Sequence, residues 1–164
     1  MRLSISKLRG FIPSRSYKWD IKFQSLPNSK VPNPPDPFSD WFPAVSCEVD
    51  EQNFSEGDFS VGGFSFSYPS NISLGSVSLS FIPDEEEKIV DWLKYQEDLR
   101  KQGYLLSDLI VGLYIVKYSG DNQIVRSYNL IVFLSSNIKR SWNSDNSVEV
   151  IPVEFKIAGF LQKK

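Results

Sequence analysis

The sequence predicts a mainly β protein, a β-sandwich or half-barrel of about seven strands with one flanking α-helix. Two observations carry this prediction. Apolar and polar residues alternate over several short segments, as they do in strands that bury one face. A single segment at about residues 84–102 instead has the three-to-four-residue spacing of an amphipathic helix. The chain has no internal repeat of solenoid or propeller length.

Length and composition are those of an ordinary globular chain. It has 164 residues, 41% of them hydrophobic, and a formal net charge of −2. We expect one β domain over residues 17–164, preceded by a basic arm over residues 1–16. The slightly acidic balance argues against a wide nucleic-acid-binding surface, which needs concentrated positive charge. No membrane segment or signal peptide is apparent, so we expect a cytosol-like compartment.

Four strand segments are predicted in the first half of the chain. They span residues 17–23, 44–49, 59–68 and 77–81. We expect Asp50–Asp58 to form a polar, acidic loop and Pro69–Gly75 to form a turn region. The pair Gly62-Gly63 interrupts the third segment and predicts a bulge or a close backbone approach.

A proline-rich loop is predicted over residues 27–43, because proline cannot donate a hydrogen bond to a strand ladder. Phe38, Trp41 and Phe42 near its end are too apolar for a free linker. Two interpretations stay open at this point: the loop folds back on its own domain, or it grips a neighbouring subunit.

The predicted helix begins with acidic residues. Asp84 can cap it, and Glu87 three residues later completes a capping-box-like pair. Gly103 is a natural stop. The residues expected to form its buried stripe are Ile89, Val90, Trp92, Leu93, Gln96 and Leu99.

Three further strands are predicted after the helix. They span residues 109–118, 125–134 and 148–160, and Gly120-Asp121-Asn122 supplies a hairpin turn between the first two. Pro152 marks an edge or a bulge in the last strand.

The residues that most enzymes need are scarce. The chain has no histidine and one cysteine, which removes the commonest general base and excludes a structural zinc site. We expect Cys47 to be a small core residue on the face of Val45 and Val49. We expect neither an enzyme nor a cofactor, and the acids of the 50–58 segment lack the alternating ligand pattern of an EF-hand loop.

Aromatic and charged residues each allow two interpretations. The aromatics Trp19, Phe64, Phe66 and Trp92 are expected in the core rather than on a stacking platform for bases or sugars. Charge is basic near the N-terminus and acidic in the middle of the chain. This distribution indicates either a solvated surface with a mobile tail or head-to-tail association between subunits.

Three segments together make the chain similar to the tail-tube family of contractile phage tails, which is related to tube proteins of type VI secretion and of contractile bacteriocins. The opening strand pair is Trp19–Phe23 with Ser46–Val49. The strand-to-helix unit is Val77–Phe81, Pro83-Asp84 and then Ile89–Trp92. The closing part is Tyr128–Ile138, Trp142–Asn146 and Val148–Phe160. The resemblance covers roughly residues 17–160, and the order of the segments carries it.

Two departures from the family pattern are present. Ser136 stands where many relatives have a proline, and the proline-rich loop is longer and more aromatic than a plain tube subunit needs. They raise the hypothesis of a specialised ring, such as a tube initiator at the baseplate.

The resemblance implies a structural virion protein whose homo-hexameric rings build a phage tail tube, as tube subunit or as baseplate-proximal initiator. It implies contacts with adjacent rings and with sheath or baseplate hub proteins, assembly in the host cytoplasm, and a lumen through which DNA passes without specific binding. The alternatives are a type VI secretion tube protein and a monomeric ligand-binding β-sandwich.

Two sets of site residues follow from this hypothesis. The expected inter-subunit or inter-ring contacts are Arg9, Arg15, Phe38, Trp41, Phe42, Asp50, Glu51, Glu56 and Asp58. The expected lumen-facing residues are Lys18, Asp20, Ser65 and Ser67, because polar side chains alternate with apolar ones in these two strands.

Overall fold

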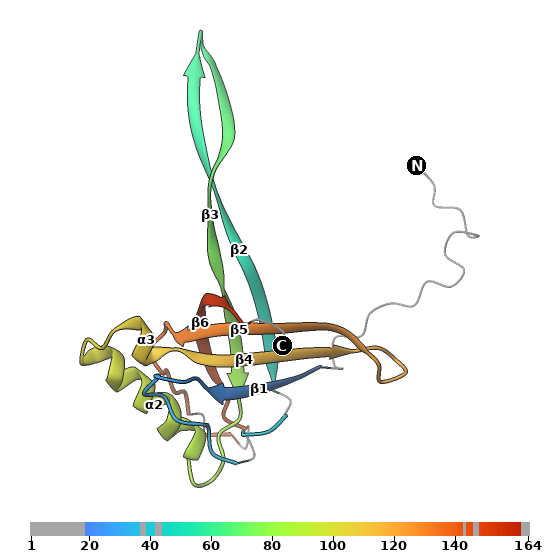
Figure 1. Ribbon diagram of the computed structural model, residues 1–164, viewed down its shortest axis with the longest axis vertical. Coiled ribbons are helices and arrows are strands. Elements are labelled where there is room, and N and C mark those ends of the chain that lie inside the picture. The colour runs from blue at the N-terminus through green and yellow to red at the C-terminus, as the bar shows by residue number, and fades with distance from the viewer. Residues whose placement is uncertain (1–18, 37–38, 42–43, 143, 146–147, 162–164) are drawn as a thin grey trace.

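One antiparallel sheet organises the protein. A computed structural model describes residues 19–36, 39–41, 44–142, 144–145 and 148–161. Its six strands follow the order β1-β4-β5-β6-β3-β2, and Figure 1 shows β2 and β3 running across the direction of β1, β4 and β5. The predicted mainly β class with a flanking helix is confirmed. The elements are β1 (Trp19–Ser25), β2 (Ser46–Val61), β3 (Phe64–Phe81), α2 (Lys88–Lys101), α3 (Leu106–Leu109), β4 (Val111–Tyr118), β5 (Ile124–Leu134) and β6 (Ile151–Phe160).

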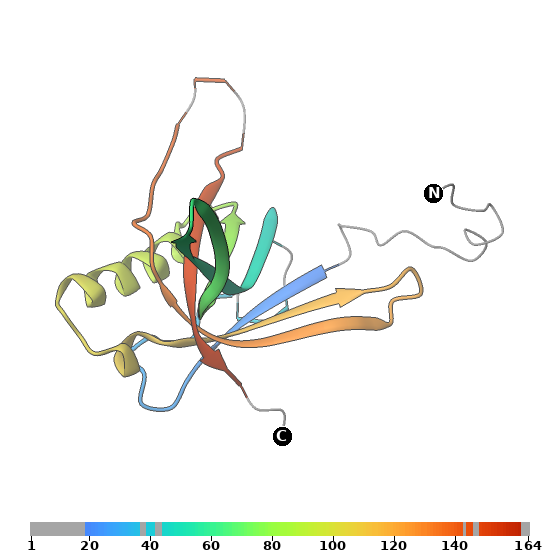
Figure 2. The same ribbon diagram turned by 90° about the horizontal axis from the view of Figure 1, so that it is seen from above.

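The core lies between α2 and one face of the sheet, and Figure 2 shows the helix on one side of the strands. All six residues predicted to form the buried stripe of the helix are buried. Phe23 of β1 lies at the centre, with its ring centroid 5.0 Å from that of Trp92 and 5.4 Å from that of Phe155. Phe23 therefore links α2 with β6, although β1 and β6 are not neighbours in the sheet.

The helix begins later than predicted. Glu87 has a left-handed backbone (φ 56°) and is the N-cap residue, so the expected Asp84–Glu87 capping box is wrong. The Glu87 carboxylate accepts a hydrogen bond from Arg140 instead, at 2.7 Å. Asp84 still helps the helix start, because its Oδ1 accepts a 3.4 Å hydrogen bond from the Ile89 backbone N–H. The helix ends as predicted, just before Gly103 (φ 76°).

Three of the predicted strand segments merge into the two long strands β2 and β3. The stretches Asp50–Asp58 and Pro69–Gly75 are strand, so the predicted acidic loop and turn region are wrong. Gly62 and Gly63 (φ 57° and 84°) make the two-residue turn of a hairpin rather than a bulge. The register shift lies at Ser55/Glu56. Residues 50–58 are mostly polar in the sequence and show no regular apolar face, which is why they resemble a loop, although they pair with β3 as strand.

The first half of the proline-rich loop folds back on its own chain. The hydroxyl of Ser29 donates to the backbone oxygen of Ile110 at 2.6 Å, and Trp92 Nε1 donates to the backbone oxygen of Pro32 at 2.9 Å. Val31 is fully buried. Of the two interpretations of this loop, folding back is therefore confirmed for residues 29–32.

The remaining strands agree with the prediction within a few residues. Pro152 pairs with Ser80 of β3 and lies beyond the last β5 partner of β6, which is Phe155. Its missing N–H therefore falls at an edge, as predicted. Neither helix in the described residues has the length and apolar composition to cross a bilayer.

The aromatic core predicts that the same phenylalanine-to-alanine change lowers the free energy of unfolding by very different amounts at two positions. Phe23 is 1% exposed and Phe64 is 71% exposed. We expect Phe23→Ala to lower the free energy of unfolding by about 3–5 kcal/mol, since it leaves a cavity among three rings. Phe64→Ala is the matched control and should change it by roughly 0.5 kcal/mol or less. Urea denaturation of both variants measures this, and equal losses would contradict the assigned core.

Candidate functional site

The β2–β3 hairpin extends far beyond the sheet. The two strands pair from Ser46↔Ser80 to Val61↔Phe64, whereas β6 accompanies β3 only over Ser76–Phe81. Residues 51–75 are therefore a two-stranded ribbon, which Figure 1 shows standing clear of the other strands. Its ten residue pairs run from Gln52↔Leu74 to Val61↔Phe64, and at about 3.3 Å per residue they span roughly 33 Å.

Gly75 lies where the ribbon leaves the sheet. A Cβ atom at this position would lie 1.7 Å from the backbone oxygen of Asp50 on β2. Only glycine permits this approach of the two backbones. Gly75 therefore helps to set the direction in which the hairpin leaves the sheet.

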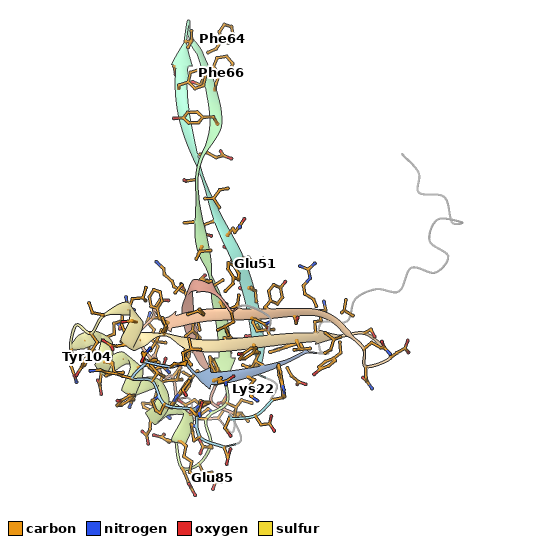
Figure 3. All side chains as sticks on the ribbon, in the orientation of Figure 1. Lys22, Glu51, Phe64, Phe66, Glu85 and Tyr104 are labelled. Carbon is orange, nitrogen blue, oxygen red and sulfur yellow. The ribbon has the colours of Figure 1, made fainter. Side chains whose placement is uncertain are left out.

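One face of the hairpin tip is apolar and exposed. The cross-strand pairs Phe59↔Phe66 and Val61↔Phe64 share this face with Tyr68. The rings of Phe59 and Phe66 stack with centroids 5.2 Å apart, and Tyr68 packs against Phe59 at 5.9 Å. Phe64 is 71% and Phe66 49% exposed, so the prediction that these two belong to the core is wrong. Figure 3 shows them at the far end of the molecule.

We call this face the aromatic tip, defined as Phe59, Val61, Phe64, Phe66 and Tyr68. A ribbon has no third strand or helix to cover its apolar face, so these side chains meet water in the isolated chain. A contiguous exposed apolar patch of this kind is typical of a protein–protein contact.

The opposite face of the tip is polar and acidic. The Ser67 hydroxyl donates to the Asp58 carboxylate at 2.7 Å, and the Ser60 and Ser65 hydroxyls lie 3.3 Å apart. The structure thus brings one predicted contact residue, Asp58, next to one predicted lumen residue, Ser67. The strands β2 and β3 contain no Lys or Arg, and their acids are Glu48, Asp50, Glu51, Glu56 and Asp58.

The other predicted site residues lie elsewhere. Trp41 is 42% exposed in the proline-rich loop. Asp20 lies on β1 between the buried residues of the opposite face, so it points away from the core. Arg9, Arg15, Lys18, Phe38 and Phe42 lie outside the described residues.

The face of the sheet away from α2 is rich in serine. Register places Ser46, Ser78 and Ser80 together on this face of β2 and β3, and the hydroxyls of Ser46 and Ser80 are 2.9 Å apart. Asp20 and Lys22 of β1 lie on the same face at the other end of the sheet. The two faces are therefore chemically distinct: one is the core, and the other is polar.

Several shifted pKa values have structural causes. Burial, with a smaller effect from Glu48, raises the pKa of the Cys47 thiol to about 11, so it stays protonated at neutral pH and is a poor nucleophile. Arg140 binds both carboxylate oxygens of Glu149, at 2.8 and 2.9 Å, as well as Glu87. These hydrogen bonds lower the pKa of both glutamates and fasten the segment before β6 to the start of α2. Among the described residues, no cluster of three Cys, Asp or Glu is placed to hold a metal ion.

Sequence reasoning missed the aromatic tip. The signal was present, because apolar residues alternate with serine, aspartate and glycine on both sides of the Gly62-Gly63 turn. Alternation of this kind normally indicates a face buried in the same chain, and it does not tell a core face from an interface.

No protein-family model and no curated sequence matches the chain. Solved structures match it in fold. A chain of the PVC sheath–tube complex, an extracellular contractile injection system in its extended state, has a TM-score of 0.61 at 12% identity, over 98% of this chain and 97% of its own length. A chain of the anti-feeding prophage baseplate, 6-fold symmetrised, has a TM-score of 0.63 at 13% identity, over 92% and 95%.

A chain of the cap that terminates the anti-feeding prophage tube has a TM-score of 0.60 at 14% identity, over 90% of this chain and 88% of its own. At these identities the likeness concerns fold. The tail-tube-like fold implied by the sequence resemblance is confirmed.

The exposure of the aromatic tip predicts that substitutions there weaken self-association without lowering the stability of the folded chain. We expect Phe59→Ser combined with Phe66→Ser to change the free energy of unfolding by about 1 kcal/mol or less, because both side chains are already exposed. The same pair should abolish self-association measured by light scattering. Tyr95→Ser, at a residue of α2 that is 45% exposed, is the control and should associate normally. A double variant that associates like the parent would show that the tip is not an interface.

Proposed function

We propose that this chain is a structural subunit whose rings, with six copies each, stack into the tube of a contractile phage tail. The observation that carries the proposal is the correspondence over 90–98% of the chain with chains of tube, baseplate and tube-cap assemblies.

The open edges of the sheet support ring formation. In the described part of the chain, β1 pairs only with β4 and β2 only with β3, so each has one unpaired backbone edge. Exposed edges invite uncontrolled pairing unless another chain covers them. In a closed ring, the β1 edge of one subunit faces the β2 edge of the next, and no edge stays free.

The hairpin supports stacking of these rings. It places the aromatic tip at one end of the molecule, and Figure 3 shows Glu85 at the opposite end. A contact between such an end of one subunit and a different surface of another is heterologous, and repeated heterologous contacts make an open filament. The acids Glu56 and Asp58 then lie between rings, as the sequence hypothesis requires.

The serine-rich face supports a wetted lumen. Six charged residues stand on this face of the sheet, and acids outnumber bases: Asp20, Glu48, Asp50 and Glu154 against Lys22 and Lys156. Such a wall offers phosphates few counter-charges, so DNA slides along it without being held. In this arrangement Asp20 faces the lumen, together with Ser65 and Ser67.

The proposal places the protein in the virion tail after assembly in the host cytoplasm, with sheath or baseplate hub proteins on its outer side. Two positions in the tail fit equally: a main tube ring, and an initiator ring next to the baseplate. They differ in whether the purified chain polymerises without a template.

Negative-stain electron microscopy with light scattering on the purified chain tests the function. We expect rings with a central hole. Long tubes that grow spontaneously indicate the main tube subunit, and single rings that extend only when baseplate or tube proteins are added indicate the initiator. A chain that stays monomeric with all tail partners present would overturn the proposal and favour a monomeric binding module.

A further inference from the structure

We propose that residues 2–6 of this chain dock as an extra strand along the open edge of β2 in the free subunit, and that they keep this edge from pairing with another subunit. We call residues 2–6 the guard strand. Its docking needs no assembly, and only the consequence for ring formation rests on the proposed function.

The apolar core of the sheet is incompletely covered at one end. A hollow of about 240 Å³ lies there, lined by Trp19, Cys47, Val49, Ile115, Lys117 and Tyr128. Four of these side chains pack against the core but are only half-buried: Trp19, Cys47, Val49 and Tyr128. Exposed apolar surface that continues a core is a place where a further apolar segment can bind.

The hollow lies between the two open edges of the sheet. Trp19 belongs to β1, and Cys47 and Val49 belong to β2, the first and last strands in the sheet order. The sheet therefore curls until its two edges approach each other across the hollow. Trp19 is also the first residue that the structure describes, so residues 1–18 continue the chain from the wall of the hollow. Residues 7–18 can span up to roughly 40 Å, which is ample to bring the guard strand to β2.

The guard strand has the sequence pattern of a strand with one apolar face. Leu3 and Ile5 alternate with Arg2, Ser4 and Ser6. Successive side chains of a strand point to opposite faces of the sheet. A strand formed by these residues therefore covers apolar surface with one face and presents polar groups on the other.

The edge of β2 matches the guard strand on both faces. Cys47 and Val49 lie on the core side of β2, and Glu48 and Asp50 alternate with them on the other side. When the guard strand pairs with this edge, its two apolar side chains continue the core surface. Its arginine then lies on the same side of the sheet as the two carboxylates, and opposite charges on neighbouring strands stabilise the pairing.

Charge favours the β2 edge over the β1 edge. The charged side chains of residues 1–18 are all basic: Arg2, Lys7, Arg9, Arg15 and Lys18. The strands β2 and β3 contain acids and no Lys or Arg. In β1 the charges of Asp20 and Lys22 cancel, and Lys117 of β4 pairs with its first residue. A basic segment therefore binds more favourably along β2 than along β1.

Docking at this edge opposes ring closure. In the proposed ring, the edge of β2 receives the β1 edge of the next subunit, and the guard strand occupies the same backbone N–H and C=O groups. A segment that covers an open edge is one of the means by which proteins prevent uncontrolled pairing. The guard strand therefore raises the concentration at which free subunits pair, and a growing tube end has to displace it.

Disulfide trapping in the full-length chain tests the docking, because Cys47 is the single cysteine and lines the hollow. The test variants are Leu3→Cys and Ile5→Cys. The control is Ser4→Cys, which has the same reach along the chain but lies on the other face of the guard strand. Each variant is treated with oxidised glutathione in dilute solution, and non-reducing gels with peptide mapping identify the disulfide. The low reactivity of Cys47 affects all three variants equally.

We expect an intramolecular disulfide with Cys47 to form at least about tenfold faster in one of the test variants than in the control. Equal rates in all three variants would overturn the docking. Disulfide-linked dimers in place of the intramolecular bond would also overturn it, since the segment would then bind a second copy.

Assembly of a second pair of variants tests whether the docked strand opposes ring formation. Leu3→Asp with Ile5→Asp removes the apolar face of the guard strand, and Ser14→Asp with Ser16→Asp adds the same two charges outside it. By light scattering and electron microscopy, we expect the first variant to form rings at a severalfold lower concentration than the parent and the control to match the parent. An unchanged or higher concentration for the first variant, or an equal change in both, would overturn the guard strand. If the disulfide forms as expected but neither parent nor variants assemble, the proposed function fails and the docking stands.

Discussion

A two-stranded ribbon cannot bury its own apolar face, and this constraint determines how the rest of the molecule is used. The core needs α2 to cover one face of the sheet, and that helix reaches only the part of the sheet near Phe23 and Phe155. Beyond Ser76 the strands β2 and β3 continue without β6. The apolar side chains at the tip are exposed to water in the single chain, and in the proposed assembly another chain covers them.

The same sheet therefore serves two purposes. Its inner face, closed by the helix, makes the isolated chain fold. In the assembly that we propose, edges of the sheet meet edges of neighbouring subunits, the polar outer face lines the lumen, and the projecting hairpin reaches a neighbour.

The sequence predicted the buried side chains of the helix and missed the exposed aromatic tip of the hairpin. The helix stripe from Ile89 to Leu99 follows a periodicity that only burial in the same chain imposes, and all of it is buried. The capping prediction failed at Glu87, because its carboxylate binds Arg140, which lies 53 residues away in sequence. The local spacing of residues does not indicate such a distant partner. Phe64 and Phe66 alternate like core residues, since an interface and a core require the same apolar side chains.

Hydrogen–deuterium exchange on the free and the assembled protein tests most directly the claim that the hairpin is an interface. In the free chain we expect the backbone amides of residues 51–75 to exchange faster than those of the core strands, because the ribbon has no buried face. Assembly should slow their exchange at least about tenfold and leave the amides next to Phe23 and Phe155 unchanged. Equal exchange of the hairpin in both states would contradict the account, since the aromatic tip would then be as exposed in the assembly as in the single chain.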